Sequence, residues 1–230
     1  MYNILLHNFI SYACPGCRIN RLEPNSSFCP SCVDKLNLIK YSECKSCGGI
    51  LDTILNVCSK CLKNEDTHWK TAVSLFEMKQ FGRDIIQRLK YQNDTSLVRP
   101  LAALSSRHFE EKYKDIDLIT YVPMHWIKYL KRGYNQSALI AKQIAFNNNI
   151  QFKRTLFRNK NTQSQTKLSA EIRRKNLVGV FGILKKVDIE NKNILVVDDV
   201  FTTGSTLCSV TNELFKGKPA SVSILVMARR

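Results

Sequence analysis

The chain has 230 residues, of which 44% are hydrophobic, and it carries a net charge of +16. An apolar content of this size builds a hydrophobic core, so global disorder is excluded. No run approaches about 18 consecutive apolar residues, and the first residues lack the basic and long apolar regions of an export signal. We therefore expect a cytoplasmic protein without a membrane span.

Eight of the nine cysteines form four C-x-x-C pairs that repeat with a period of 30 residues. Each pair places two thiolates within reach of one metal ion, as is common in a reducing compartment. The pairs are Cys14/Cys17, Cys29/Cys32, Cys44/Cys47 and Cys58/Cys61. We predict two structural Zn2+ ions with four thiolates each, either from neighbouring pairs or with the first pair joining the third. A redox role is less favoured, because it usually involves a single pair beside a βαβ unit.

After a polar linker the pattern changes to alternating strands and helices. The expected strands cover residues 72–78, 117–123, 194–197 and 220–227, and the expected helices cover residues 81–91, 97–113, 127–146 and 204–215. Residues 194–197 are all apolar, which indicates a strand buried on both faces of a parallel sheet. We predict an α/β domain with a mostly parallel sheet in residues 67–230, behind a zinc-binding module in residues 1–66. The polar, basic residues 159–175 predict a mobile loop leading into a short helix.

The most informative segment follows the strand expected at residues 194–197. Asp198 and Asp199 stand at its carboxyl end, where ligands bind in open α/β sheets. Two adjacent carboxylates accept hydrogen bonds from neighbouring sugar hydroxyls. The next residues offer hydroxyls, backbone N–H groups and a helix N-terminus to a phosphate: Thr202, Thr203, Gly204, Ser205 and Thr206. This combination favours a ribose 5-phosphate site over a plain turn with a helix cap.

The run D-D-V-F-T-T-G-S-T resembles the 5-phosphoribosyl 1-pyrophosphate (PRPP) motif of type I phosphoribosyltransferases, with Ser205 where Ala is common. The whole chain resembles the ComF competence-protein family, through the cysteine pairs, L-K-Y at residues 89–91, R-G-Y-N-Q at residues 132–136 and the PRPP motif. The resemblance implies a type I phosphoribosyltransferase-like domain behind the zinc module, and a role in DNA uptake during natural transformation. It also implies that Arg132 and Gly133 approach the pyrophosphate and that Mg2+ accompanies PRPP.

Charge favours a second, larger anion. Residues 118–187 contain one acidic residue, Glu171, and fourteen basic residues, more than one pyrophosphate requires. This excess favours polyanion binding over a merely solubilising surface, and with the resemblance it points to single-stranded DNA. The candidate DNA-binding residues are Lys131, Arg158, Lys160, Lys167, Arg173, Arg174 and Lys175. A competence helicase or another DNA-processing protein is the expected protein partner.

The sequence leaves the activity open among three functions. The resemblance implies that a nucleophile attacks the ribose C1 carbon and pyrophosphate leaves, with Asp198 and Asp199 as the candidate catalytic residues. No residue pattern identifies the nucleophile. A nucleobase salvage phosphoribosyltransferase and a PRPP-sensing regulator without turnover are therefore alternatives to the DNA-uptake protein.

Overall fold

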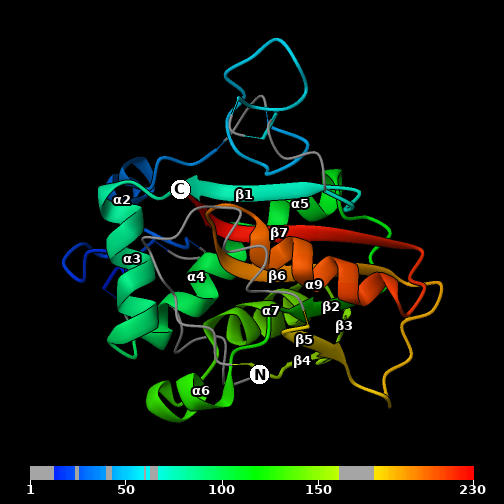
Figure 1. Cartoon of the computed structure of the whole chain (residues 1–230). Coiled ribbons are helices and arrows are strands. Elements are labelled where there is room, and N and C mark those ends of the chain that lie inside the picture. The colour runs from blue at the N-terminus through cyan, green and yellow to red at the C-terminus, as the bar shows by residue number, and fades with distance from the viewer. Residues whose placement is uncertain (1–12, 24–25, 40–42, 60, 63–66, 161–178) are drawn as a thin grey trace, which may run out of the picture.

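The computed structural model describes residues 13–23, 26–39, 43–59, 61–62, 67–160 and 179–230. Its main element is a five-stranded sheet in the order β1-β7-β6-β2-β3, with every neighbouring pair parallel (Figure 1). These strands are β1 (Ala72–Glu77), β2 (Leu118–Tyr121), β3 (Gln151–Phe152), β6 (Asn193–Phe201) and β7 (Ser221–Arg229). A separate antiparallel ribbon consists of β4 (Leu156–Arg158) and β5 (Phe181–Ile183). The prediction of an α/β fold with a mostly parallel sheet is confirmed.

Helices cover both faces of the sheet, because successive side chains of a strand point to opposite sides. The helical segments are α2 (Pro30–Lys35), α3 (Gln80–Tyr91), the 3-10 turn η1 (Thr95–Leu97), α4 (Val98–Ala103), α5 (Ser106–Glu111), α6 (Trp126–Arg132), α7 (Gln136–Asn147) and α9 (Ser205–Phe215). Leu195 and Val197 of β6 share a core with α3, α4 and α7. Ile194 and Val196 share the other core with α9 and the ribbon.

The prediction of one helix over residues 127–146 is wrong, because α6 and α7 are separate helices. Gly133, with φ of 80°, ends α6 in the left-handed conformation that favours glycine. The side chain of Asn135 then accepts hydrogen bonds from the backbone of Ser137 and Ala138 and begins α7. The G-Y-N segment at residues 133–135 therefore separates the two helices.

The helix expected over residues 97–113 is also divided, into η1, α4 and α5. At the second boundary the Ser105 hydroxyl donates to the carbonyl of Ala102 at 2.6 Å, a local bond that competes with the helical pattern. Most of the loop and short helix expected at residues 159–175 lies outside the described residues.

The cysteine-rich segment packs directly on the sheet. Leu38 forms an antiparallel bridge with Phe76 of β1, and the Ile39 N–H donates to the Leu75 carbonyl at 2.9 Å. Cysteines 14, 29 and 32 belong to the core that contains α3, and cysteines 44, 47, 58 and 61 belong to the opposite core. The boundary between residues 66 and 67 stays a prediction. Within the part of the chain that the structure describes, none of the helices has the length and apolar character needed to span a bilayer.

Candidate functional site

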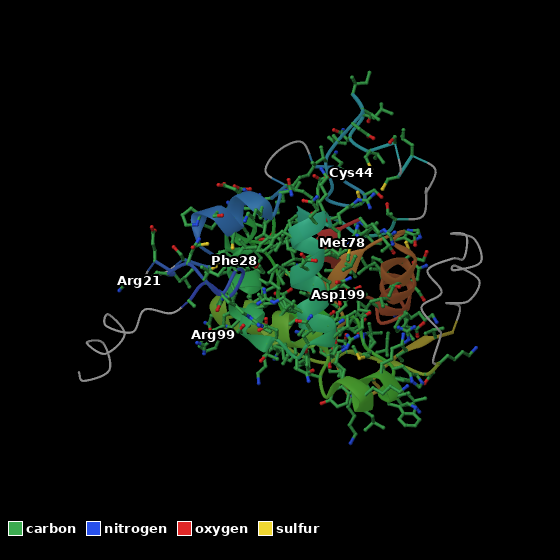
Figure 2. All side chains as sticks on the ribbon, turned by 90° about the vertical axis from the view of Figure 1, so that its left-hand side faces the viewer. Arg21, Phe28, Cys44, Met78, Arg99 and Asp199 are labelled. Carbon is green, nitrogen blue, oxygen red and sulfur yellow. The ribbon has the colours of Figure 1, made fainter. Side chains whose placement is uncertain are left out.

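Two carboxylates lie at the end of β6, close to the middle of the sheet, and Figure 2 labels Asp199 in the interior. Asp199 is only 5% exposed. Lys90 Nζ of α3 lies 2.8 Å from Asp199 Oδ1, and Gln136 Nε2 of α7 donates to Asp199 Oδ2. The hydroxyl of Ser137, also in α7, donates to Asp198 Oδ1 at 2.9 Å. Side chains from two helices therefore hold the carboxylate pair.

The surroundings of Asp198 shift its protonation equilibrium. Burial, and after it repulsion from Asp199, raises the pKa of Asp198 to about 7. Burial lowers the pKa of Lys90, but attraction to Asp199 outweighs it, so the pKa of Lys90 lies above its usual value. Lys90 therefore remains charged beside Asp199, while the Asp198 carboxyl both donates and accepts protons within the physiological range.

The residues after β6 turn into α9 through Gly204, whose φ is 78°. A Cβ at this position would lie 2.7 Å from the Phe201 ring, so the turn requires glycine for its conformation and for the close approach. The hydroxyls of Thr203 and Ser205 lie 2.8 Å apart. Gly204 has no side chain to cap α9, and the first turn of α9 contains no acidic residue. Its backbone N–H groups and positive helix end therefore suit an anion.

Arg132 is connected to the carboxylates through an amide. Its Nη1 donates to Gln136 Oε1 at 2.6 Å, and the nitrogen of the same amide donates to Asp199. The guanidinium also lies over the ring of Tyr91, 5.2 Å from its centroid. Gly133 ends α6, and a Cβ at Gly133 would meet nothing within 4 Å.

Further cations lie around the same site. Burial lowers the pKa of Lys128, and repulsion from Arg158, Arg132 and Lys90 lowers it further. Burial lowers the pKa of Arg158, while attraction to Asp198 opposes this effect. A buried acid pair surrounded by cations can bind a ligand that carries both hydroxyls and phosphates.

Three of the seven residues expected to bind DNA are described. Lys131 is exposed on α6, and Lys160 is exposed after β4. Arg158 is half-buried, with its guanidinium 5.4 Å from the centroid of the Phe181 ring. The other four lie outside the described residues: Lys167, Arg173, Arg174 and Lys175.

Sequence reasoning missed the residues that hold the acid pair: Lys90, Gln136 and Ser137. The L-K-Y and R-G-Y-N-Q motifs carried the family resemblance without a role for Lys90 or Gln136. The two adjacent carboxylates could have indicated them, because a buried pair requires a cation and amide or hydroxyl donors from neighbouring elements.

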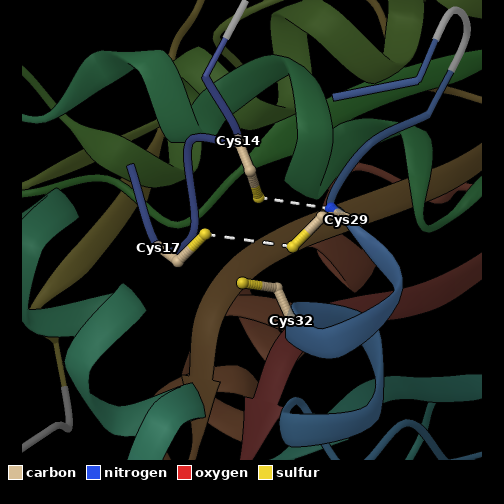
Figure 3. Close-up of side chains that lie close together, drawn as sticks. All are labelled: Cys14, Cys17, Cys29 and Cys32. Atoms are coloured by element: carbon tan, nitrogen blue, oxygen red, sulfur yellow. Dashed lines mark hydrogen bonds between the residues drawn. The ribbon is translucent and has the colours of Figure 1, made fainter. Parts of the chain in front are cut away.

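The eight paired cysteines form two groups in chain order: cysteines 14, 17, 29 and 32, and cysteines 44, 47, 58 and 61. Figure 3 shows the four side chains of the first group converging. The Sγ atoms of Cys17 and Cys29 are 3.9 Å apart, and those of Cys47 and Cys58 are 3.8 Å apart. A tetrahedron with Zn–S bonds of about 2.3 Å has edges of about 3.8 Å. Both groups could therefore hold Zn2+, and pairing of the first C-x-x-C with the third does not occur.

Two arginines connect the cysteine groups to the rest of the molecule. Arg229 of β7 donates from Nε to Cys47 Sγ at 2.9 Å and from Nη1 to the Thr202 carbonyl at 3.4 Å. The Arg229 guanidinium also lies 5.0 Å from the centroid of the Phe201 ring. Arg88 of α3 donates to the Pro15 carbonyl at 2.6 Å, beside the first group. Because a cluster of four thiolates and one Zn2+ carries a net charge of −2, a buried guanidinium beside it stabilises it.

Comparisons with known proteins agree with this arrangement. Residues 130–230 match the family model of the phosphoribosyl transferase domain. The chain is 30% identical to competence protein F of Haemophilus influenzae over 235 residues, which cover 96% of this chain and 99% of that protein. It is 25% identical to DNA utilization protein YhgH of Salmonella typhi, covering 94% of this chain and 96% of that protein. It is 26% identical to competence protein ComFC of Bacillus subtilis, covering 90% and 86%.

The parallel sheet, the acid pair at the end of β6 and the matched domain define a phosphoribosyltransferase-like protein with a cysteine-rich module before that domain. The full-length similarity narrows the class further. The chain belongs to the ComF family of competence proteins, as the sequence resemblance predicted.

The first prediction concerns metal content. The purified protein should contain about two Zn2+ per chain, and Cys44→Ser should lose one of them, because three thiolates hold Zn2+ less tightly than four. Elemental analysis of both proteins measures this. Cys208→Ser is the matched control, since Cys208 lies outside both groups, and it should retain both ions. A parent protein without zinc contradicts the prediction.

The second prediction concerns Arg229. Arg229→Met should weaken Zn2+ binding at the second cysteine group roughly 10- to 100-fold, the usual cost of removing a hydrogen-bond partner of a metal ligand. Zn2+ transfer to a coloured chelator should then show one ion released early and one at the parent rate. Arg88→Met is the comparison variant: Arg88 donates to backbone carbonyls beside the first group and to no cysteine sulfur, so its loss should change zinc release less. Release of both ions from Arg229→Met at the parent rate contradicts the role assigned to Arg229.

Proposed function

We propose that this ComF-family protein binds PRPP at the end of β6 and single-stranded DNA on the adjoining basic surface, and that it acts in DNA uptake during transformation. One observation carries the PRPP assignment: Asp198 and the buried Asp199 lie near the carboxyl end of β6, and the chain then passes through a glycine turn into α9, whose N-cap residue Gly204 has no side chain. The N-terminus of α9 offers N–H donors to the 5-phosphate of PRPP, and the carboxylates offer hydrogen-bond acceptors to its ribose diol.

The proposed arrangement gives each part of PRPP a partner. Thr202, Thr203, Gly204, Ser205 and Thr206 bind the 5-phosphate. Asp198 and Asp199 accept hydrogen bonds from the ribose hydroxyls, while Lys90 balances their charge. Arg132 and the backbone at Gly133 approach the pyrophosphate, with Lys128 nearby as a further cation.

Mg2+ fits this site because it takes oxygen ligands, and carboxylate and hydroxyl oxygens gather at the end of β6. When bound with PRPP, Mg2+ would offset the charge that pyrophosphate gains as it leaves the ribose. The chain itself supplies the remaining functions: it orients the ribose through Asp198 and Asp199 and neutralises the phosphates through arginine and lysine.

The DNA-binding assignment rests on charge and on the relatives. Residues 118–187 carry fourteen basic residues against one acidic residue. The names of the relatives refer to competence and to DNA utilization. Contacts of cations with phosphates supply affinity without sequence preference, which suits a protein that handles imported strands of any sequence.

The third prediction tests the diol contacts. Asp198→Asn should weaken PRPP binding by about 1.5–3 kcal/mol, the scale of a hydrogen bond to a charged group, without lowering the melting temperature. Isothermal titration in the presence of Mg2+ measures the affinity. Asp34→Asn is the control. It also replaces one carboxyl by an amide, at an exposed position on α2 that is far from Asp198 in the sequence. If Asp198→Asn binds PRPP as the parent does, the assignment of the carboxylates is wrong.

The fourth prediction tests the DNA contacts. If about five cations contact phosphates, the logarithm of the affinity for single-stranded DNA should fall with the logarithm of salt with a slope of about −3.5. Replacing Lys131 and Lys160 by Gln should reduce the magnitude of this slope by about 1.4, at about 0.7 per contact. Fluorescence anisotropy of a labelled oligonucleotide measures it.

The control variant for this experiment replaces Lys70 and Lys114 by Gln. Both are exposed, and they precede β1 and β2, so they lie toward the amino ends of the parallel strands, away from the proposed site. The control removes the same total charge and should leave the slope unchanged.

A screen for pyrophosphate release with nucleobases, nucleotides and DNA as acceptors separates the three activities. Release with a free base, from a protein that does not bind single-stranded DNA at low salt, identifies a salvage enzyme. PRPP binding without release for any acceptor identifies a PRPP-sensing regulator.

A further inference from the structure

Helix α6 exposes apolar side chains to an unusual extent. No residue of α6 is buried, and Trp126, Tyr129 and Leu130 are 63%, 50% and 71% exposed. Because these residues are three and four positions apart, they share one face of the helix. The opposite side carries Lys128 and Arg132, which lie toward the cations and amides around the acid pair. The usual arrangement of a surface helix is therefore reversed, with the apolar face toward solvent.

Local hydrogen bonds at both ends stabilise α6, while its apolar face remains exposed. Seven residues are too few for a helix that is stable by itself. At its start, the Ile127 N–H donates to His125 Nδ1 at 3.3 Å, and at its end the Gly133 N–H donates to the Tyr129 carbonyl at 2.7 Å. The apolar face thus stays available, and an exposed patch of this kind marks an interaction surface.

Basic residues and a further aromatic side chain lie on and near α6. Lys131 is exposed on the same helix, and Tyr91 is 74% exposed beneath the Arg132 guanidinium. The sequence has no acidic residue between positions 118 and 170. In Figures 1 and 2, α6 lies at the lower edge of the molecule, far from the second cysteine group at the top.

This chemistry favours a nucleic acid over a protein as the occupant. Aromatic side chains with cations between them bind single-stranded DNA, because each base has a face that stacks and each phosphate is negative. The core of a protein interface, in contrast, is depleted in lysine. The complete absence of acidic residues over this segment complements a polyanion.

We propose that Trp126, Tyr129 and Leu130, which we call the α6 platform, form a stacking site for the bases of single-stranded DNA, while the exposed Lys131 of the same helix contacts the phosphate backbone. The proposal rests on the DNA binding stated under the proposed function. It adds base stacking, which contributes affinity that does not depend on salt, to the contacts between cations and phosphates. On the opposite side of the same helix, Arg132 donates to Gln136, so α6 itself borders the proposed PRPP site.

Intrinsic fluorescence offers a direct test, because the chain has two tryptophans of opposite exposure. Trp69 is 7% exposed and donates to the Ser46 carbonyl, whereas Trp126 is 63% exposed. Titration of the full chain with oligothymidylate of about 16 nucleotides should quench part of the emission, since a base stacks on Trp126. In Trp126→Phe the quenching should disappear while anisotropy still reports binding, because phenylalanine also stacks.

Affinity and salt dependence then separate stacking from charge. The double variant Trp126→Ala/Tyr129→Ala should bind the oligonucleotide at least about fivefold more weakly, while its salt slope stays at the parent value, because no charge is removed. Phe146→Ala is the matched control: Phe146 is 83% exposed at the far end of α7, near the amino end of β3, and its loss should change neither quantity.

The failures of the two proposals look different. If the parent binds no single-stranded DNA at low salt, the proposed function fails and the platform fails with it. If the parent binds but the double variant binds equally well, the platform alone is overturned. The platform is also overturned if the double variant binds DNA normally but loses self-association in sedimentation, or loses binding to vesicles of anionic phosphatidylserine, because the face would then belong to a second copy or a membrane surface.

Discussion

Two adjacent carboxylates at the end of a buried strand determine much of the arrangement around the site. Asp199 is buried and Asp198 beside it is partly buried, so their charge requires partners within the molecule. Lys90 reaches them from α3, and Gln136 and Ser137 reach them from the first turn of α7. Segments that are more than 100 residues apart in the chain therefore meet at one point, and any ligand of the acids must compete with these partners.

The parts of the fold that were predictable from sequence depend on local patterns. The apolar run at residues 194–197 predicts a central strand, because only a strand covered on both faces needs no polar position. The spacing of the cysteines predicts that they are metal ligands. The structure adds which pairs come together, in two groups of four cysteines in chain order. Contacts between distant segments were not predictable. Lys90 ends an ordinary amphipathic helix, and only the packing of α3 against β6 shows that it neutralises Asp199.

The division of residues 127–146 into two helices shows a different limit. Apolar residues continue at helical spacing through the G-Y-N segment, so periodicity alone extends the helix across it. The backbone decides otherwise, since Gly133 adopts a positive φ and Asn135 caps the next helix. The break sets Gln136 at the start of α7, where its amide donates to Asp199.

The position of β7 in the sheet affects how the protein is made. Among the described strands β7 comes last in chain order, yet it lies between β1 and β6 and is the only strand that pairs with β1. While the nascent chain emerges from the ribosome, β1 has no neighbouring strand until β7 arrives, and its open edge is a site for wrong pairing. The cysteines emerge much earlier, so the two groups could take up metal before Arg229 is synthesised to balance the negative charge of the thiolates. Synthesis thus separates the time at which the cysteines can bind metal from the time at which the sheet closes. During this interval the edge of β1 is unpaired, and a chaperone would be most useful then.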